Sequence, residues 1–157
     1  MIRSGPNVLL ADPDSAAREH LAQHLRSAGY KVSTTDCGRD VILLCEIDPP
    51  DILILNVHLP DMDGFEVCEY VRRDSRDGDL SLILITEGVN QLERAYFAPM
   101  AEFAGGDYFL TKPFDVRLLV QLIDDIVGPR EASSEPAKRR SPTHATFPTA
   151  RLPVAAS

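Results

Sequence analysis

Short apolar runs alternate with longer amphipathic segments along the first 128 residues of the chain. A run that is apolar at consecutive positions and bounded by Gly, Pro or Asp indicates a strand buried on both faces. Five runs fit this pattern, namely Asn7–Ala11, Lys31–Thr35, Ile52–Asn56, Leu82–Thr86 and Asp107–Leu110. The segments between these runs are long enough for a helix after each strand.

The intervening segments carry helix signals. Ser15–Ala28 places Leu21 and Leu25 on one face, with Asp14 before it as the N-cap and Gly29 after it as the residue that ends the helix. The other predicted helices are Gly38–Ile47, Gly64–Arg73, a helix within Asn90–Ala104 and a helix that follows Pro113 and runs through Val127.

Strands that alternate with helices predict an α/β fold, in which helices cover both faces of a doubly wound, five-stranded parallel sheet. In open sheets of this type, functional sites lie outside the carboxyl ends of the strands. Polar residues follow four of the predicted strands: Asp12-Pro13-Asp14, Asn56-Val57-His58, Thr86-Glu87 and Lys112-Pro113. We therefore expect these four clusters to form one pocket.

The composition of the chain changes near Gly128. Residues 129–157 contain five prolines and one aromatic residue, Phe147, so we predict a disordered Pro/Ser/Ala-rich tail after one folded domain, residues 1–128. The domain carries 11 Lys/Arg and 22 Asp/Glu, a net charge of −11, whereas the tail carries 5 and 2. An acidic domain is a poor match for a phosphate backbone, so we expect no nucleic-acid partner. We interpret Lys138-Arg139-Arg140 as a solubilising cluster.

Membrane association and export are not expected. No apolar run approaches the roughly 20 residues that span a bilayer, and the N-terminus lacks the charged and then apolar layout of a signal peptide. The three cysteines, Cys37, Cys45 and Cys68, form no C-x-x-C pair. An odd number of cysteines without metal-binding spacing indicates reduced thiols. We therefore expect a cytoplasmic protein.

Two motifs follow predicted strands: LPDMDG at residues 59–64 and LTKPF at residues 110–114. With the four polar clusters, they closely resemble the motifs of bacterial response-regulator receiver (CheY-like) domains, and the resemblance covers residues 7–127. It implies the flavodoxin-like strand order 2-1-3-4-5 and a role in two-component, phosphorelay signalling. In that family, a histidine kinase phosphorylates the aspartate that closes the third strand.

The resemblance also implies roles for individual residues. Thr86 would supply the hydroxyl that follows the phosphoryl group, and Phe109 would be the aromatic side chain that rotates on activation. Lys112 would pair with the phosphoryl oxygens, and the peptide bond after it would be cis. Asp12 would be one of the acidic residues around the metal. We expect Thr86, Phe109 and Lys112 to form the switch.

Three departures from the family pattern change the expected chemistry. Asn56 replaces the acceptor aspartate, and an amide is a very poor nucleophile. Pro13 replaces a carboxylate that binds Mg²⁺, which leaves Asp12 and the carbonyl of His58 as metal ligands. Glu87 brings bulk and negative charge to the path of the phosphate. We therefore predict no cofactor, lost or weak Mg²⁺ binding and no acyl-phosphate chemistry.

Two functions from different classes remain. The favoured one is a stand-alone pseudo-receiver without enzymatic activity, which binds a histidine kinase or another signalling protein independently of phosphorylation. The alternative is a receiver that is phosphorylated on a non-standard aspartate near the pocket, with Asp12, Asp14 and Asp61 as candidates. A flavin-binding protein of the same topology is disfavoured, because the loop after the first strand has no Ser/Thr/Gly phosphate cradle.

Several interpretations of the pocket stay open. Lys112 is expected to be a structural partner of Asp12, and Glu87 to share its ammonium group. A Glu87–Lys112 contact would imitate the phosphorylated state and hold the switch in one position. His58 is either a pH sensor at the rim or an ordinary exposed histidine. Asp14 either caps the first helix or occupies the place of the missing metal ligand.

The segment around the fourth helix is the predicted binding surface. From Thr86 to Lys112 the chain is about one helical turn longer than the family's usual spacing, and Pro99 is expected to kink or restart the helix. In receivers, the fourth helix, fifth strand and fifth helix form a docking and dimerisation face, which implies a protein partner and allows a homodimer. The predicted contact residues are Arg94, Tyr96, Phe97, Met100 and Phe103.

Overall fold

The computed structural model describes residues 5–74, 80–88 and 90–128, and the predicted tail, residues 129–157, lies outside these described residues. The strands are β1 (Asn7–Ala11), β2 (Lys31–Thr35), β3 (Ile52–Asn56), β4 (Ser81–Thr86) and β5 (Tyr108–Thr111). The helices are α1 (Ser15–Ser27), α2 (Gly38–Ile47), α3 (Gly64–Asp74), α4 (Gln91–Ala104) and α5 (Val116–Val127). The predicted alternation of strands and helices is confirmed.

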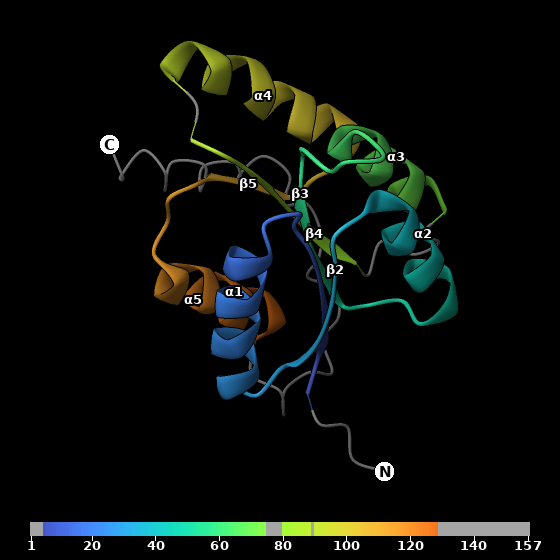
Figure 1. Cartoon of the computed structure of the whole chain (residues 1–157), viewed down its shortest axis with the longest axis vertical. Coiled ribbons are helices and arrows are strands. Elements are labelled where there is room, and N and C mark those ends of the chain that lie inside the picture. Colours follow the sequence, from blue (N-terminus) through green and yellow to red (C-terminus); the bar gives the residue numbers. More distant parts are fainter. Residues whose placement is uncertain (1–4, 75–79, 89, 129–157) are drawn as a thin grey trace.

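The five strands form one parallel sheet in the order β2-β1-β3-β4-β5. Helices α1 and α5 cover one face of the sheet, and helices α2, α3 and α4 cover the other (Figure 1). The doubly wound α/β fold and its strand order are therefore as predicted.

Alternate residues of each strand enter opposite halves of the core. In β1, Val8 and Leu10 pack on the side of α1 and α5, whereas Leu9 packs on the side of α2, α3 and α4. The residues of β3 divide in the same way, and all five are buried. Because side chains alternate along a strand, an uninterrupted apolar run supplies both halves of the core.

The ends of the elements follow local chemistry. The Asp14 carboxylate accepts hydrogen bonds from the first-turn amides of α1, and Gly29 follows that helix with φ of 99°, a conformation that favours glycine. Strand β5 begins one residue later than predicted. Asp107 belongs to the preceding turn, where its carboxylate accepts hydrogen bonds from Arg72 and from the Leu82 amide.

Helix α4 continues through Pro99 as one element, so of the two expected alternatives, a kink or a restart, the restart is excluded. Both ends of the helix are fixed independently of the proline. Asn90 and Glu93 form a reciprocal capping box, and Gly105 ends the helix in the left-handed conformation. Beyond the proline, Ala101 packs into the core on the same side of the sheet as α2 and α3. Packing therefore outweighs the hydrogen bond that the proline removes.

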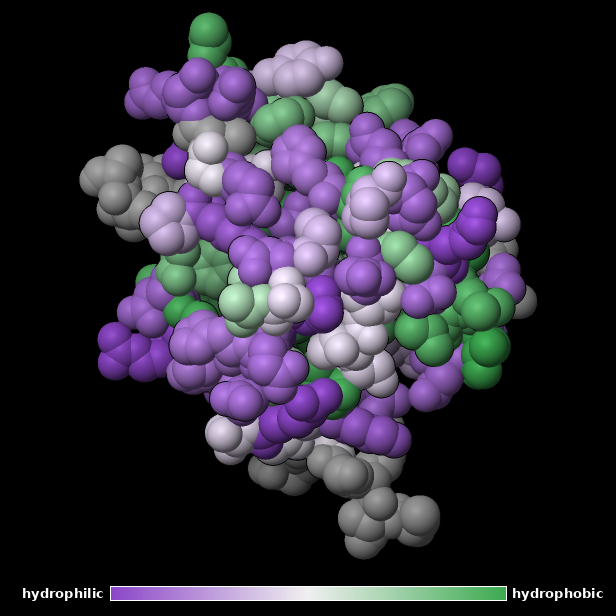
Figure 2. All heavy atoms as spheres, viewed as in Figure 1, coloured by the Kyte–Doolittle hydropathy of each residue, from purple (hydrophilic) through white to green (hydrophobic). Residues whose placement is uncertain are grey.

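The view of Figure 2 shows a mainly hydrophilic surface on which hydrophobic side chains gather along α4 and near α2. Exposed large apolar residues lie on these helices and on α3 and α5: Leu43, Ile47, Tyr70, Leu92, Tyr96, Phe103 and Leu118. Across the ranges that the structure describes, none of the helices combines the length and hydrophobicity needed to cross a bilayer.

Candidate functional site

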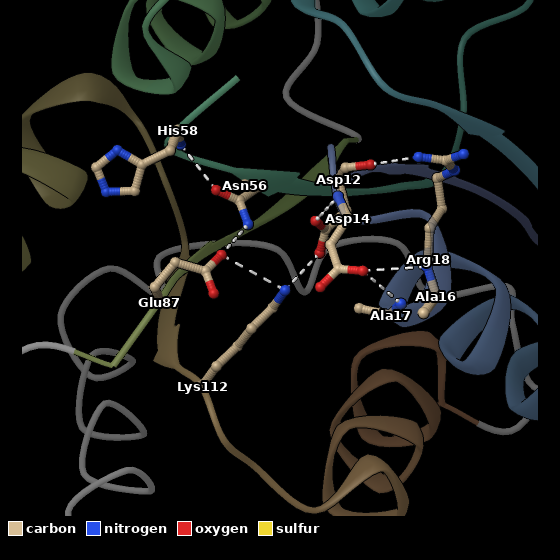
Figure 3. A network of polar contacts seen from close by, with 9 residues as sticks. All are labelled: Asp12, Asp14, Ala16, Ala17, Arg18, Asn56, His58, Glu87 and Lys112. Atoms are coloured by element: carbon tan, nitrogen blue, oxygen red, sulfur yellow. Dashed lines mark hydrogen bonds and ion pairs between the residues drawn. The ribbon is translucent and has the colours of Figure 1, made fainter. Parts of the chain in front are cut away.

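A network of polar side chains, called the pocket from here on, lies where four parallel strands end (Figure 3). Asp12 follows β1, Asn56 closes β3, Glu87 follows β4 and Lys112 follows β5. Parallel strands bring their carboxyl ends to the same edge of the sheet, which is why residues 100 positions apart meet here. The structure thus brings together the four clusters that the sequence placed at this edge.

Asn56 forms the floor of the pocket and is fully buried. Its Oδ1 accepts a hydrogen bond of 2.7 Å from the backbone amide of His58, and its Nδ2 donates one of 3.0 Å to Oε2 of Glu87. The two partners fix the orientation of the amide, because a backbone N–H only donates and a carboxylate only accepts. Both ends of the Asn56 side chain are therefore occupied.

Lys112 stands between two carboxylates. Its Nζ lies 2.8 Å from Oδ2 of Asp12 and 3.5 Å from Oε2 of Glu87. Burial alone would lower the pKa of the lysine, but the hydrogen bond and charge of Asp12, with a contribution from Glu87, raise the pKa above its usual value. The pocket therefore holds its own cation, which stays charged at neutral pH.

Asp12 is held from three sides. Besides its ion pair with Lys112, Oδ1 accepts a hydrogen bond of 2.9 Å from the amide of Asp14. Nη1 of Arg18 donates a hydrogen bond of 2.7 Å to the backbone carbonyl of Asp12. Sequence reasoning missed Arg18, although its place in the first turns of α1 puts it within reach of this loop. Asp14 caps α1, so its carboxylate is engaged there.

The two buried residues of the predicted switch lie on neighbouring strands, with Thr86 at the end of β4 and Phe109 in β5. Thr86 is fully buried, and its Oγ1 has no hydrogen-bond partner within the described part of the chain. Phe109 is buried as well and packs in the core between the sheet and α4. The Lys112–Pro113 peptide bond is cis. His58 is exposed at the rim, and its ring lies edge-on to Phe97 with the ring centroids 6.2 Å apart.

The loop after β3 passes close over the strand end. Gly64 donates a backbone hydrogen bond of 2.9 Å to Val57, and a Cβ atom at Gly64 would lie 2.6 Å from the carbonyl oxygen of Asn56. Only glycine fits this approach. From the same loop, Asp61 accepts hydrogen bonds from the amides of Gly38 and Arg39 at the start of α2, and these bonds lower its pKa.

The residues at this edge fit a divalent cation poorly. Both carboxylate oxygens of Asp12 already accept hydrogen bonds, one from Lys112 and one from the Asp14 amide. Pro13 has no side-chain oxygen, and the neutral side chain of Asn56 is hydrogen-bonded to Glu87. Mg²⁺ sites normally rest on one or two carboxylates with free coordination positions. Among the described residues, no group of three or more His, Cys, Asp or Glu side chains is arranged to hold a metal ion.

The predicted contact residues of α4 divide between two sides of the helix. Tyr96 and Phe103 are 64% and 86% exposed, whereas Phe97 and Met100 pack against the core. Arg94 is half-buried, and its Nε is buried without a hydrogen-bond partner among the described residues. Sequence reasoning missed one exposed residue of this helix, Leu92, which is 77% exposed. Its spacing of four and eleven residues from Tyr96 and Phe103 was a usable signal.

The fold and the pocket define a class of protein. The family model "Response regulator receiver domain" matches residues 8–124 of the chain. This match covers both sequence motifs, all of the sheet except Asn7, and every residue of the pocket. The chain belongs to the response-regulator receiver domain family.

Known proteins similar to the chain agree with this assignment. It is 30% identical over 133 residues to the DNA-binding dual master transcriptional regulator RpaA of Synechocystis sp., which covers 85% of this chain and 54% of that protein. It is 34% identical over 124 residues to the transcriptional regulatory protein GltR of Pseudomonas aeruginosa, covering 78% and 49%. The chain thus spans about half the length of these relatives.

Solved structures show the same fold. A CheY-like receiver domain protein of Methanospirillum hungatei superimposes with a TM-score of 0.68 at 27% sequence identity, covering 78% of this chain and 93% of the other.

One of the relatives bears on the expectation that this chain binds no nucleic acid, because the name of RpaA includes the term DNA-binding. That description concerns a protein about twice as long as the matched region.

Proposed function

We propose that this chain is an atypical receiver that takes part in two-component signalling by binding another protein, without accepting a phosphoryl group. The observation that carries the proposal is the state of Asn56: it is neutral, fully buried and hydrogen-bonded at both ends. An amide is a very poor nucleophile toward phosphorus, because its nitrogen lone pair is delocalised into the carbonyl group. We therefore also propose that the chain is not an enzyme and binds Mg²⁺ weakly.

The positions of the other carboxylates support the proposal over the rival function. Asp14 is engaged as the cap of α1 and Asp61 as an acceptor at the start of α2. Asp12 has the ammonium of Lys112 on one oxygen and a backbone amide on the other. Each candidate acceptor would have to give up a stabilising contact before it attacked a phosphodonor.

The proposed partner-binding surface is the outer side of α4, defined by Leu92, Tyr96, Pro99 and Phe103. All four residues are exposed, and at 100° per residue they lie on one side of the helix. Large exposed apolar side chains that line up in this way mark protein-binding surfaces. In receivers the fifth helix belongs to the same docking face, and on α5 of this chain Leu118 is 49% exposed. The occupant would be a histidine kinase, another signalling protein or a second copy of the chain.

Phosphoryl transfer is tested by intact-mass spectrometry. After incubation with Mg²⁺ and acetyl phosphate, we expect no mass increase, whereas a conventional receiver with an acceptor aspartate, treated in parallel, gains one phosphoryl group. A stoichiometric adduct that hydroxylamine removes would establish the rival function. Peptide mapping would then distinguish Asp12, Asp14 and Asp61.

Partner binding is tested by exchanging single exposed residues for glutamate. We expect Phe103→Glu to reduce binding to a captured signalling partner, or self-association in sedimentation velocity, by at least tenfold, because it places a charge in an apolar contact. Leu43→Glu on α2 is the matched control, since Leu43 is exposed but lies on another helix. Equal binding by both variants and the wild type would exclude the outer side of α4.

A further inference from the structure

Glu87 occupies the place in the pocket where hydrogen-bond donors converge. Its Oε2 accepts the hydrogen bond of Asn56 Nδ2 at 3.0 Å and lies 3.5 Å from Nζ of Lys112. The hydroxyl of the preceding residue, Thr86, is buried nearby in the chain without a partner within the described ranges. An amide N–H and an ammonium group that meet at one oxygen are donors that suit an oxyanion.

We propose that Glu87 is an internal anion that excludes phosphate-like ligands from this pocket, and that the amide of Asn56 and the carboxylate of Glu87 form a matched pair. The proposal adds to the proposed function an explanation of why the pocket stays closed. It depends on the pocket alone, so it can fail while the binding surface on α4 stands, and the reverse also holds.

The direction of the hydrogen bond between Asn56 and Glu87 is the argument that these two residues are matched. Glu87 is an acceptor, so it needs a donor from position 56, and the Nδ2 group of Asn56 supplies one. An aspartate at position 56 would bring a second carboxylate to about the same 3.0 Å separation. Two carboxylates at that distance cannot both ionise without a strong penalty. The residue at position 56 therefore determines which residue position 87 tolerates.

The balance of charges in the pocket is the argument that phosphate-like anions are excluded. The ammonium of Lys112 is shared between Asp12 and Glu87, so two carboxylates face one cation. Arg18 faces the backbone carbonyl of Asp12 and does not contact either carboxylate. An incoming anion would meet an excess of negative charge. Repulsion from a single charge at about 4 Å changes affinity by roughly fivefold in bulk water, and by more where water is displaced.

The position of Glu87 makes the idea testable without disturbing the core. Its side chain is 54% exposed and forms the outer wall of the pocket, whereas Asn56 is fully buried below it. Replacing Glu87 by alanine therefore opens the pocket toward solvent and creates no internal cavity. Lys112 keeps its closer partner, Asp12, at 2.8 Å.

The first experiment is a titration with inorganic phosphate, followed by the backbone amide NMR signals of His58 and Lys112. We expect Glu87→Ala to bind phosphate saturably and at least tenfold more tightly than the wild type. Glu46→Ala is the charge-matched control, because Glu46 is exposed in the last turn of α2, at the opposite end of the sheet. Equal affinities in the wild type and Glu87→Ala would overturn the exclusion.

The second experiment is a double-mutant cycle for the equilibrium constant of unfolding. We expect Asn56→Asp to raise the unfolding constant at least tenfold more in the presence of Glu87 than in the Glu87→Ala background, a coupling of about 1.4 kcal/mol. Additive effects of the two substitutions would overturn the matched pair. If Asn56→Asp does not fold in the presence of Glu87 but folds with Glu87→Ala, the coupling is shown directly.

Discussion

At the scale of single residues, the pocket is organised around the ammonium group of Lys112. Asp12 is almost completely buried, and Lys112 lies 2.8 Å from its carboxylate. A buried carboxylate without a counter-ion is strongly unfavourable, even where the ion pair itself contributes little net stability. Lys112 therefore has a structural role in this protein that does not require a phosphoryl group.

Removing this cation should destabilise the fold. We expect Lys112→Met to lower the free energy of unfolding by about 2–4 kcal/mol in urea titrations at neutral pH, because Asp12 is left unpaired. Lys31→Met is the control, since Lys31 is exposed on the edge strand β2, and surface substitutions of this kind change stability by about 0.5 kcal/mol or less. A loss no larger than that of the control would contradict the structural role.

The same pair gives a pH dependence with a defined sign. The folded state raises the pKa of Lys112 above its usual value of 10.5. The stabilisation is complete below the unfolded-state pKa, and it is lost as the pH rises through the folded-state pKa. The difference in unfolding free energy between the wild type and Lys112→Met should therefore shrink as the pH rises above the usual lysine pKa of 10.5 and through the raised pKa of the folded state. A difference that grows over this range would contradict the assignment.

At the scale of elements, Arg72 joins α3 to two neighbouring turns. Its Nε donates to the carbonyl of Gly105 at 3.0 Å, and Nη1 donates to that of Leu80 at 2.7 Å. Nη2 forms an ion pair of 2.9 Å with Asp107. One guanidinium group thus fixes the end of α3, the entry to β4 and the turn between α4 and β5. The geometry uses the planar, multiple donors that distinguish arginine from lysine.

A substitution at Arg72 measures the contribution of this junction. We expect Arg72→Met to lower the free energy of unfolding by about 2–3 kcal/mol, because it removes the side-chain donors to two carbonyls and leaves Asp107 with only the Leu82 amide as a donor. Arg73→Met is a matched control in the same helical turn, where the side chain is exposed. If both variants unfold at the same urea concentration, the junction contributes nothing measurable.

For helix α4, the sequence predicted the position of the helix but not which residues face outward. The residue pattern placed a helix within Asn90–Ala104, and the structure has it at Gln91–Ala104. Pro99 is a strong local signal for a break, yet capping at Asn90 and burial of Ala101 keep the helix continuous. Composition marked the aromatic residues of α4 as candidates for binding. The side on which each one lies depends on how the helix rests on the sheet.

At the scale of the whole molecule, charge limits the range of partners. The chain has a formal net charge of −8, with an acidic domain and a basic remainder. Proteins that bind nucleic acid gain most of their non-specific affinity from neutralised phosphates, and an acidic domain has the wrong sign for this. The curated relatives are longer by about a factor of two. What they bind with the rest of their length does not follow for this domain.

This leads to a prediction for the whole chain. We expect no saturable change in fluorescence anisotropy when labelled duplex DNA is titrated with the protein at about 150 mM salt. Salt-sensitive binding would contradict the prediction. A variant that ends at Gly128 would then show whether the Lys138-Arg139-Arg140 cluster is responsible.

The sequence by itself determined the fold class, the strand order through its resemblance to receivers, and the edge of the sheet where Asp12, Asn56, Glu87 and Lys112 meet. Hydrophobic periodicity and strand-end positions are local properties, so they can be read along the chain. It also determined that an amide stands where an acceptor carboxylate is expected. None of this required knowledge of the packing.

Only the tertiary structure decided how these groups use one another. The hydrogen bond from Asn56 to Glu87 spans 31 residues, and the one from Gly38 to Asp61 spans 23. Such contacts depend on side-chain directions that are set when helices pack on the sheet, and these directions leave no periodic signal in the sequence. The packing joins Asn56, Glu87, Lys112 and Asp12 in one network of polar contacts.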